Sequence, residues 1–399
     1  MNYLNVQNLN VKKKASPLLA CIPLLLLICT PFQHITAQEF SNIHEFIKKL
    51  SSDSLYGRGY QYDGDKKAAK LISSEFAKLG YERSVQSVRF DLNEFATSPN
   101  LLINGKPFVI AEDFLPDAST PSTDVFFNGQ TISAAYSIDS TEIYLPSSES
   151  PQVILKKSNS LFHSLSGNQQ QVPRINISSE VWPDSVASLS YSLTTNVNNI
   201  QSNNLIFFAD STEPFTHLIT AHYDHLGTIG EVVFNGANDN ASGVGMMLIL
   251  ADTLRNYSDD INPLFVAFTA EEAGLIGSRY FHHFYKDWWD DVSVVVNFDM
   301  VASGDGQVGL VGAVESEELY GLIENISAPE RFYLKPRPNS PNSDHFWFLE
   351  SGLSGFYVYT GNGKQPYHHP KDDFESLDLI LFNELAEFMT TFLIESANN

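Results

Sequence analysis

The chain has 399 residues, of which 43% are hydrophobic and 12% aromatic, so it can bury one large core or a core plus a smaller module. Its 24 basic and 47 acidic residues make it strongly acidic, and an acidic protein repels the phosphate backbone, so no nucleic-acid partner is expected. The acidic excess leaves many carboxylates available as hard metal ligands.

Residues 1–37 have the order of a secretory signal peptide. Lysines at 12–14 precede an apolar run at 15–32, and a short polar stretch leads to Ala37, near which we expect cleavage. A membrane anchor is the competing interpretation, but prolines interrupt the run and it is shorter than the ~20 apolar residues that span a bilayer. We therefore expect a secreted or periplasmic protein that has no stable membrane span once the signal is removed.

Both cysteines, Cys21 and Cys29, lie inside this predicted signal. The mature chain is then expected to form no disulfide and to offer no thiolate to a metal. Any metal ion must be bound by His, Asp and Glu side chains.

Two helices are predicted after the signal, over Phe40–Leu50 and Asp65–Leu79, and Gly80 ends the second. Residues 101–200 lack a long helical period, and we interpret them as a β-rich insertion because an irregular loop of that length is uncommon. Strands in it are predicted at Val125–Phe127, Glu142–Leu145, Val153–Leu155 and Arg174–Ile177.

Strands and helices alternate from Leu205 onward, which predicts an α/β sandwich with a largely parallel central sheet. The expected strands are His217–Ala221, Leu264–Ala270, Val292–Phe298, Val308–Val311 and Gly355–Thr360. The expected helices are Ala241–Tyr257, Gly274–Tyr285, Glu315–Ile326, Asp344–Glu350 and Leu377–Glu395. Together with residues 38–100, residues 201–399 are predicted to form one domain.

Imidazole and carboxylate groups follow several of the predicted strands, and ligands of open α/β sheets bind beyond the carboxyl ends of the strands. Each group alone is weak, because adjacent glutamates are usually solvated and an Asp often caps a helix. These groups occur together in a chain whose mature form is expected to lack cysteine, and this combination matches a site for two divalent ions. The groups are His222 and Asp224, Glu271 and Glu272, Asp299, His368 with its neighbour Tyr367, and Asp239 at the opening of a predicted helix.

Two-metal chemistry suggests how the ligands divide. A pair of ions needs one carboxylate between them, and Asp239 suits this bridge because it lies in a Gly-rich turn at a helix start. His222 and Asp299 can complete one metal, and Glu272 and His368 the other.

Three further residues are predicted to serve catalysis. Glu271 is free to act as general base, taking a proton from a metal-activated water and passing it to the leaving amine. Asp224 is expected to hold the second nitrogen of His222, and Tyr367 to hydrogen-bond the oxyanion.

Five motifs resemble the dizinc exopeptidase family, metallopeptidase family twenty-eight, which includes secreted bacterial aminopeptidases, glutamate carboxypeptidases and glutaminyl cyclases. The motifs are Ala221–His225, Gly236–Gly243, Ala270–Gly274, Asn297–Met300 and Tyr367–Pro370. The resemblance covers most of residues 40–95 and 205–395, and it implies a zinc-exopeptidase fold, a three-layer α/β sandwich with a mixed central sheet. It also implies two Zn²⁺ per chain, the ligand and base roles given above, and His368 rather than His369 as ligand.

The chain departs from the family in residues 101–200, which resemble a reduced or divergent protease-associated domain. Ser343-Asp344-His345 resembles a motif near the site, and its interpretation as a supporting group or as a capped helix start is open. We expect His225, His282 and His283 to be surface or core residues without a ligand role.

The resemblance favours an aminopeptidase acting on peptide substrates. A carboxypeptidase or dipeptidase is the main competing function and needs basic side chains for the substrate carboxylate, for which four arginines are available. They are Arg58, Arg279, Arg331 and Arg337. A glutaminyl cyclase, an acyltransferase with a single zinc, and an inactive binding protein are the remaining candidates, and the sequence leaves the oligomeric state open.

Overall fold

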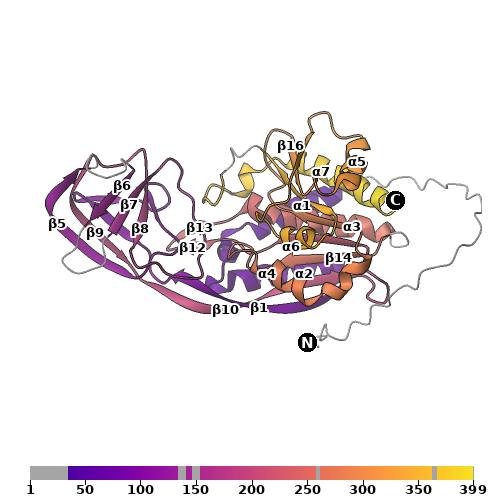
Figure 1. The fold of residues 1–399 in the computed structure, drawn as a ribbon, viewed down its shortest axis with the longest axis horizontal. Coiled ribbons are helices and arrows are strands. Elements are labelled where there is room, and N and C mark those ends of the chain that lie inside the picture. Colours follow the sequence, from indigo (N-terminus) through magenta and orange to yellow (C-terminus); the bar gives the residue numbers. More distant parts are fainter. Residues whose placement is uncertain (1–34, 134–140, 146–152, 258–260, 362–365, 399) are drawn as a thin grey trace, which may run out of the picture.

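The computed structural model describes residues 35–133, 141–145, 153–257, 261–361 and 366–398 of the chain (Figure 1). Most of the predicted signal peptide, with Cys21 and Cys29, lies outside these residues. Every helix in the described ranges is too short or too polar to cross a lipid bilayer.

An eight-stranded mixed sheet forms the centre of the peptidase domain, in the order β1-β10-β14-β11-β15-β18-β16-β17. Its central strands β14, β11, β15 and β18 run parallel, and antiparallel pairing of β1, β10 and β16 makes the sheet mixed. The central strands are buried on both faces, as parallel strands usually are. The bounds are β1 Glu82–Phe95, β10 Thr195–Phe208, β11 His217–His222, β14 Pro263–Phe268, β15 Val294–Phe298, β16 Gln307–Val311, β17 Tyr333–Arg337 and β18 Gly355–Thr360.

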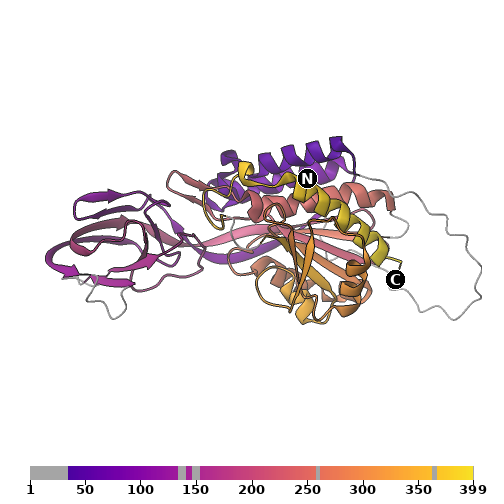
Figure 2. The same ribbon diagram turned by 90° about the horizontal axis from the view of Figure 1, so that it is seen from above.

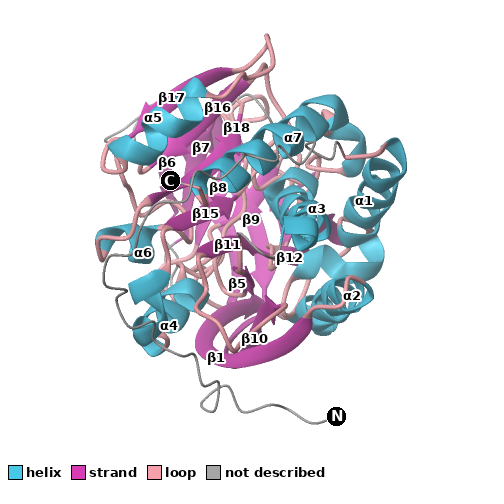
Figure 3. Cartoon of the chain, turned by 90° about the vertical axis from the view of Figure 1, so that its right-hand side faces the viewer, coloured by secondary structure: helices cyan, strands magenta, loops and turns pink. Residues whose placement is uncertain are grey.

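Helices cover both faces of this sheet, so the predicted three-layer α/β sandwich is confirmed (Figure 3). One face packs against α1 Ala37–Leu50, α2 Gly64–Lys78, α3 Gly243–Leu254, α5 Glu317–Asn325 and α7 Leu379–Ser396. The other face packs against α4 Ile276–Phe284 and α6 Phe346–Glu350.

The predicted elements are present, and most bounds move by one or two residues. The largest shift is in β5, which ends at Ser133 and not at Phe127, and the one that bears on the site is in α3, which begins at Gly243 and not at Ala241. Residues 237–242 form an irregular turn in which Asp239 has φ −109° and ψ 91°, outside the helical region. This turn carries the predicted bridging carboxylate.

Strands β1 and β10 form a long antiparallel ribbon that the sequence analysis did not predict. Each strand has 14 residues, and they pair along their whole length, from Glu82 opposite Phe208 to Phe95 opposite Thr195. The ribbon runs from the edge of the central sheet into the insertion (Figures 1 and 2). The predicted domain boundary at residue 200 therefore lies inside β10.

Residues 100–193 form two four-stranded sheets, ordered β3-β2-β9-β5 and β4-β8-β7-β6. Their strands are β2 Asn100–Ile103, β3 Lys106–Phe108, β4 Phe114–Pro116, β5 Thr123–Ser133, β6 Glu142–Leu145, β7 Val153–Ser158, β8 Arg174–Ser178 and β9 Ser185–Leu193. Their hydrophobic core also contains Leu226, Ile229 and Phe234, which belong to or flank the hairpin of β12 Gly227–Ile229 and β13 Val232–Phe234. The peptidase domain thus contributes a hairpin to the core of the insertion.

Candidate metal centre

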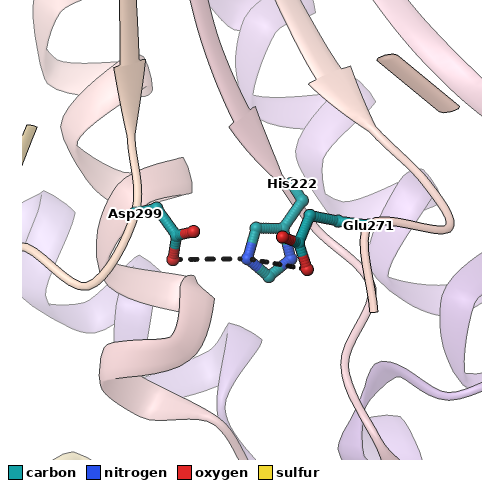
Figure 4. Close-up of side chains that lie close together, drawn as sticks. All are labelled: His222, Glu271 and Asp299. Carbon is teal, nitrogen blue, oxygen red and sulfur yellow. Dashed lines mark hydrogen bonds and ion pairs between the residues drawn. The ribbon is translucent and has the colours of Figure 1, made fainter. Parts of the chain in front are cut away.

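Side chains from three neighbouring strand ends converge on one point. His222 is the last residue of β11, Asp299 follows β15, and Glu271 follows β14. One ligand atom from each of these residues lies within 4.8 Å of the other two. Figure 4 shows the imidazole of His222 between the two carboxylates.

Asp239 divides the centre into two halves. Its Oδ1 lies 3.4 Å from Nε2 of His222, and its Oδ2 lies 3.2 Å from Nε2 of His368. The first imidazole also faces Asp299 Oδ1 at 3.4 Å, and the second faces Glu272 Oε2 at 3.1 Å. The structure therefore brings together all five predicted ligands, with one oxygen of Asp239 directed to each half.

The charges of the centre favour cations. Burial lowers the pKa of His368, but the carboxylates of Glu272 and Asp239 outweigh it and raise this pKa to about 11. His222 behaves alike, since the carboxylates of Glu271 and Asp299 overcome burial and raise its pKa well above the ordinary value. Four clustered carboxylates and two imidazoles fit a pair of divalent ions such as zinc, which binds nitrogen and oxygen donors.

Arg58 is fully buried beside the centre. Its role there was not predicted from the sequence. Its guanidinium donates to five main-chain carbonyls, those of Leu50, Tyr223, Asn235, Gly236 and Asp239. Burial lowers the pKa of Arg58 to about 10, which leaves the side chain charged at neutral pH. Arg58 thus fixes the turn around Asp239 and is not free to bind a substrate carboxylate.

Asp224 holds the second nitrogen of His222 as predicted, but mainly through its main chain. The Nδ1 atom of His222 bonds the main-chain oxygen of Asp224 at 3.1 Å, whereas the carboxylate Oδ1 lies 3.9 Å away. The carboxylate instead accepts from Tyr60 Oη at 2.8 Å and from the N–H groups of Glu271 and Glu272 at 3.2 and 3.4 Å. The side chain points to the end of β14, so it orients the two glutamates and leaves the imidazole to the backbone.

Asp372 connects the loop that carries His368 to the turn that carries Asp239. Its carboxylate accepts from the N–H groups of Asn238 at 2.8 Å and Asp239 at 3.0 Å. Its main-chain oxygen accepts from the N–H of Ala237 at 3.1 Å. This role could not be predicted from the sequence, because no spacing rule reports a contact made to backbone groups.

The three histidines expected to have no ligand role differ from one another. His225 is buried, and its Nδ1 lies 2.6 Å from Oε1 of Glu272, so it supports a predicted ligand. His282 stacks on Trp289 and bonds Ser351, and His283 is exposed on the same helix. Only His225 of the three contacts the centre.

Ser343 supports Asp299. Its hydroxyl donates to Asp299 Oδ2 at 2.7 Å and accepts from Asn297 Nδ2 at 2.8 Å. Asp344 and His345, which follow it, are fully buried. Burial raises the pKa of Asp344 to about 7. Of the two interpretations of this motif, the structure favours the supporting group.

Tyr367 is half exposed, and its ring stacks on His368 with centroids 3.8 Å apart. Burial of the hydroxyl and the charge of Asp239 raise its pKa, so the phenol keeps its proton at neutral pH and can donate a hydrogen bond. Its oxyanion role stays a prediction.

Part of the chain resembles a known protein family and several curated proteins. Residues 204–393 match the model of peptidase family M28. Aminopeptidase YwaD of Bacillus subtilis is 28% identical over 251 residues, which are 58% of this chain and 53% of that protein. Leucine aminopeptidase 2 of Trichophyton equinum is 30% identical over 141 residues, 32% of this chain and 28% of that protein. The chain thus aligns with about half of the length of the first of these relatives and with less than a third of the length of the second.

A solved structure of a zinc aminopeptidase from Bacillus subtilis has the same fold. It covers 92% of this chain and 95% of its own, with 21% identity and a TM-score of 0.67. The fold is the three-layer sandwich that the resemblance in the sequence implied. Residues 204–393, which include the five converging ligands, carry the match to peptidase family M28.

Proposed function

We propose that this protein is an aminopeptidase that binds two zinc ions and hydrolyses the N-terminal peptide bond of its substrates. The observation that carries the proposal is the division of the Asp239 carboxylate between two sets of ligands. The activities in the names of the similar proteins support the choice of reaction, since they are aminopeptidases.

His222 and Asp299 would hold one zinc ion, Glu272 and His368 the other, and Asp239 both. When bound, the ions supply Lewis acidity and lower the pKa of a water molecule. Hydrogen bonds from neighbouring side chains orient two of these ligands: the His225 imidazole contacts Glu272, and the Ser343 hydroxyl contacts Asp299.

Glu271 is proposed as the general base. Its carboxylate reaches within 3.9 Å of His222 Nε2, and its side chain is the most exposed of the acids around that imidazole. Burial raises the pKa of Glu271, which suits a group that takes a proton from water and returns it to the leaving amine.

The carboxypeptidase alternative lacks support in the four arginines considered for it. Arg58 donates its hydrogen bonds to main-chain carbonyls, and Arg331 forms ion pairs with Asp378 and Glu384. Arg279 lies over the ring of Trp347, and Arg337 bonds Tyr359. Each cation already has a partner within the chain.

Export belongs to the same proposal, on the strength of residues 1–37. The predicted cleavage near Ala37 falls at the first residue of α1, so a cut directly after Ala37 would remove Thr36, which closes the first turn in a capping box with Glu39. Mass spectrometry of the protein from the extracellular or periplasmic fraction tests the prediction of export. Recovery of an unprocessed chain in the cytoplasm alone would refute it.

The activity is tested with amino-acid anilides and with dipeptides carrying a free or a blocked amine. We expect hydrolysis of free-amine substrates only, loss of activity with a chelator, and its return with zinc at two equivalents per chain. Preference for N-blocked over C-blocked peptides would indicate a carboxypeptidase instead, and cyclisation of N-terminal glutamine with one zinc would indicate a cyclase.

A further inference from the structure

We infer that the β-rich insertion is a working component of the metal centre, because its residue His163 holds the metal ligand His368 in the ligating orientation. The inference rests on the proposed zinc centre and assigns a positioning role to a residue outside the region matched by the family model, which begins at residue 204.

Two hydrogen bonds, both made by main-chain groups of His163, join the residues. The N–H of His163 donates to the carbonyl oxygen of His368 at 3.0 Å. The carbonyl oxygen of His163 lies 2.8 Å from Nδ1 of His368. A carbonyl can only accept, so Nδ1 carries a hydrogen, and Nε2 is the nitrogen that faces Asp239 and Glu272, where its lone pair would bind a zinc ion.

The backbone of His368 has an unusual conformation that these hydrogen bonds stabilise. Its φ is +51°, in the left-handed region that residues other than glycine rarely adopt. A ligand in this conformation needs surrounding contacts to keep it there. The two bonds from His163 fix both the backbone and the ring of His368.

The ring of His163 anchors its own loop. It lies between Phe95 of the ribbon and Phe234 of the β13 hairpin strand, with ring centroids 5.8 and 5.3 Å away. Its Nδ1 has no hydrogen-bond partner among the described residues. The ring therefore acts through its shape, as an aromatic wedge between these two side chains.

The β12–β13 hairpin also connects the insertion to the proposed bridging ligand, Asp239. Ile229 and Phe234 lie in the hydrophobic core of the insertion, and the chain continues from Phe234 directly into the turn that carries Asp239. The insertion therefore supports the half of the centre formed by His368, Glu272 and Asp239, and leaves the half around Asp299 to the central sheet.

The test compares zinc binding by three variants of the full chain. His163→Ala removes the wedge, His163→Phe keeps an aromatic ring, and Phe162→Ala removes an exposed neighbour in the same loop as a control. Stepwise zinc affinities are measured by competition with a chromophoric chelator, and kcat and KM with an anilide substrate.

We expect His163→Ala to weaken the binding of one zinc ion by about 10–100-fold and to leave the other ion unchanged. His163→Phe and Phe162→Ala should bind both ions like the wild type. Unchanged affinities in His163→Ala, or equal losses in His163→Phe and His163→Ala, would overturn the inference. A wild-type chain that bound no zinc would refute the proposed function, and this inference with it.

Phe95→Leu provides a second route if His163→Ala does not fold. This variant thins the packing on the ribbon side of the wedge and leaves the loop sequence intact. A several-fold loss of affinity at the same single zinc ion is expected. Affinities equal to those of the wild type at both ions would contradict the positioning role.

Discussion

Glu271 and Glu272 are adjacent in the chain but face different tasks, because the turn after β14 directs them to different partners. Glu272 is held between His225 and His368, whereas Glu271 faces His222 on the more open side. Sequence could assign these residues, since strand ends and motif spacing specify ligands. It could not find the support from Arg58 and Asp372, which bind main-chain atoms whose positions depend on the folded loops.

Replacing Glu271 by Gln tests the base. The amide cannot accept a proton, so we expect kcat to fall by about 10²–10⁴-fold while two zinc ions remain bound. Steady-state kinetics and metal analysis of the purified variant measure both quantities. Glu231→Gln, at an exposed position, serves as the control and should behave like the wild type. A Glu271→Gln enzyme within threefold of wild-type kcat would exclude the assigned role.

At the scale of elements, strong periodicity decided what could be predicted. The buried strands β11, β14 and β15 and the helices around them have apolar patterns that are clear from sequence alone. Strand β10 lacks such a pattern over residues 196–204, which read Asn-Val-Asn-Asn-Ile-Gln-Ser-Asn-Asn. Its partner β1 does alternate at Val88, Phe90 and Leu92, but the length of the ribbon depends on the pairing of the two strands, which local propensity does not report.

Asp372→Asn tests the link between the His368 loop and the Asp239 turn. An amide in place of the carboxylate can accept from only one of the two N–H groups, which leaves the other buried without a partner. We expect a loss of about 1–3 kcal/mol in the free energy of unfolding and weaker zinc binding. Denaturant titration and chelator competition measure these effects.

The neighbouring Asp373→Asn is the matched control for that variant. Asp373 caps a short turn through Ser376 N, and Asn is an equally good cap. Zinc affinity and stability should stay close to those of the wild type. If Asp372→Asn were as mild as this control, the carboxylate would not be holding the turn.

His217 links β11 to α7 and gives a pH-dependent contribution to stability. Its ring is buried between Thr216 Oγ1 and Ser396 Oγ, and burial lowers its pKa to about 4. The unfolded chain has the ordinary pKa of ~6.5, so it binds the proton first as the pH falls. Stability is therefore full above pH ~6.5 and decreases by about 3 kcal/mol as the pH falls to ~4.

The variant His217→Gln removes this titration. Its stability, measured by denaturant unfolding between pH 7.5 and 4.5, should decline less steeply than that of the wild type. His283→Gln, at an exposed position, should retain the wild-type slope. Parallel profiles for His217→Gln and the wild type would mean that the buried ring does not control acid stability.

For the whole molecule, the metal centre lies where the peptidase domain and the insertion meet. Zinc would join β11, the turn before α3, the ends of β14 and β15 and the loop after β18, so its loss should be felt globally. A ligand present at 100 times its Kd adds about 2.7 kcal/mol to the stability of the folded state.

Removal of zinc by a chelator should therefore lower Tm, by about 5–10 °C for a domain of this size. Differential scanning calorimetry before and after chelation, and again after zinc is restored, measures the shift. Asp239→Asn should show the lower Tm at the outset and gain little from added zinc. An unchanged Tm on chelation would mean that the ligands are held in place without the ions.

The ribbon has one consequence for how such proteins can diversify. Because Phe95 lies opposite Thr195, the chain leaves and re-enters the catalytic domain at points separated by a single strand spacing. The segment between them, residues 96–194, can thus be enlarged, shortened or exchanged without shifting the register of the neighbouring strands. A replacement must satisfy two conditions that its own fold does not reveal: an apolar surface that covers Ile229 and Phe234, and a loop long enough to reach His368 and offer it a carbonyl oxygen.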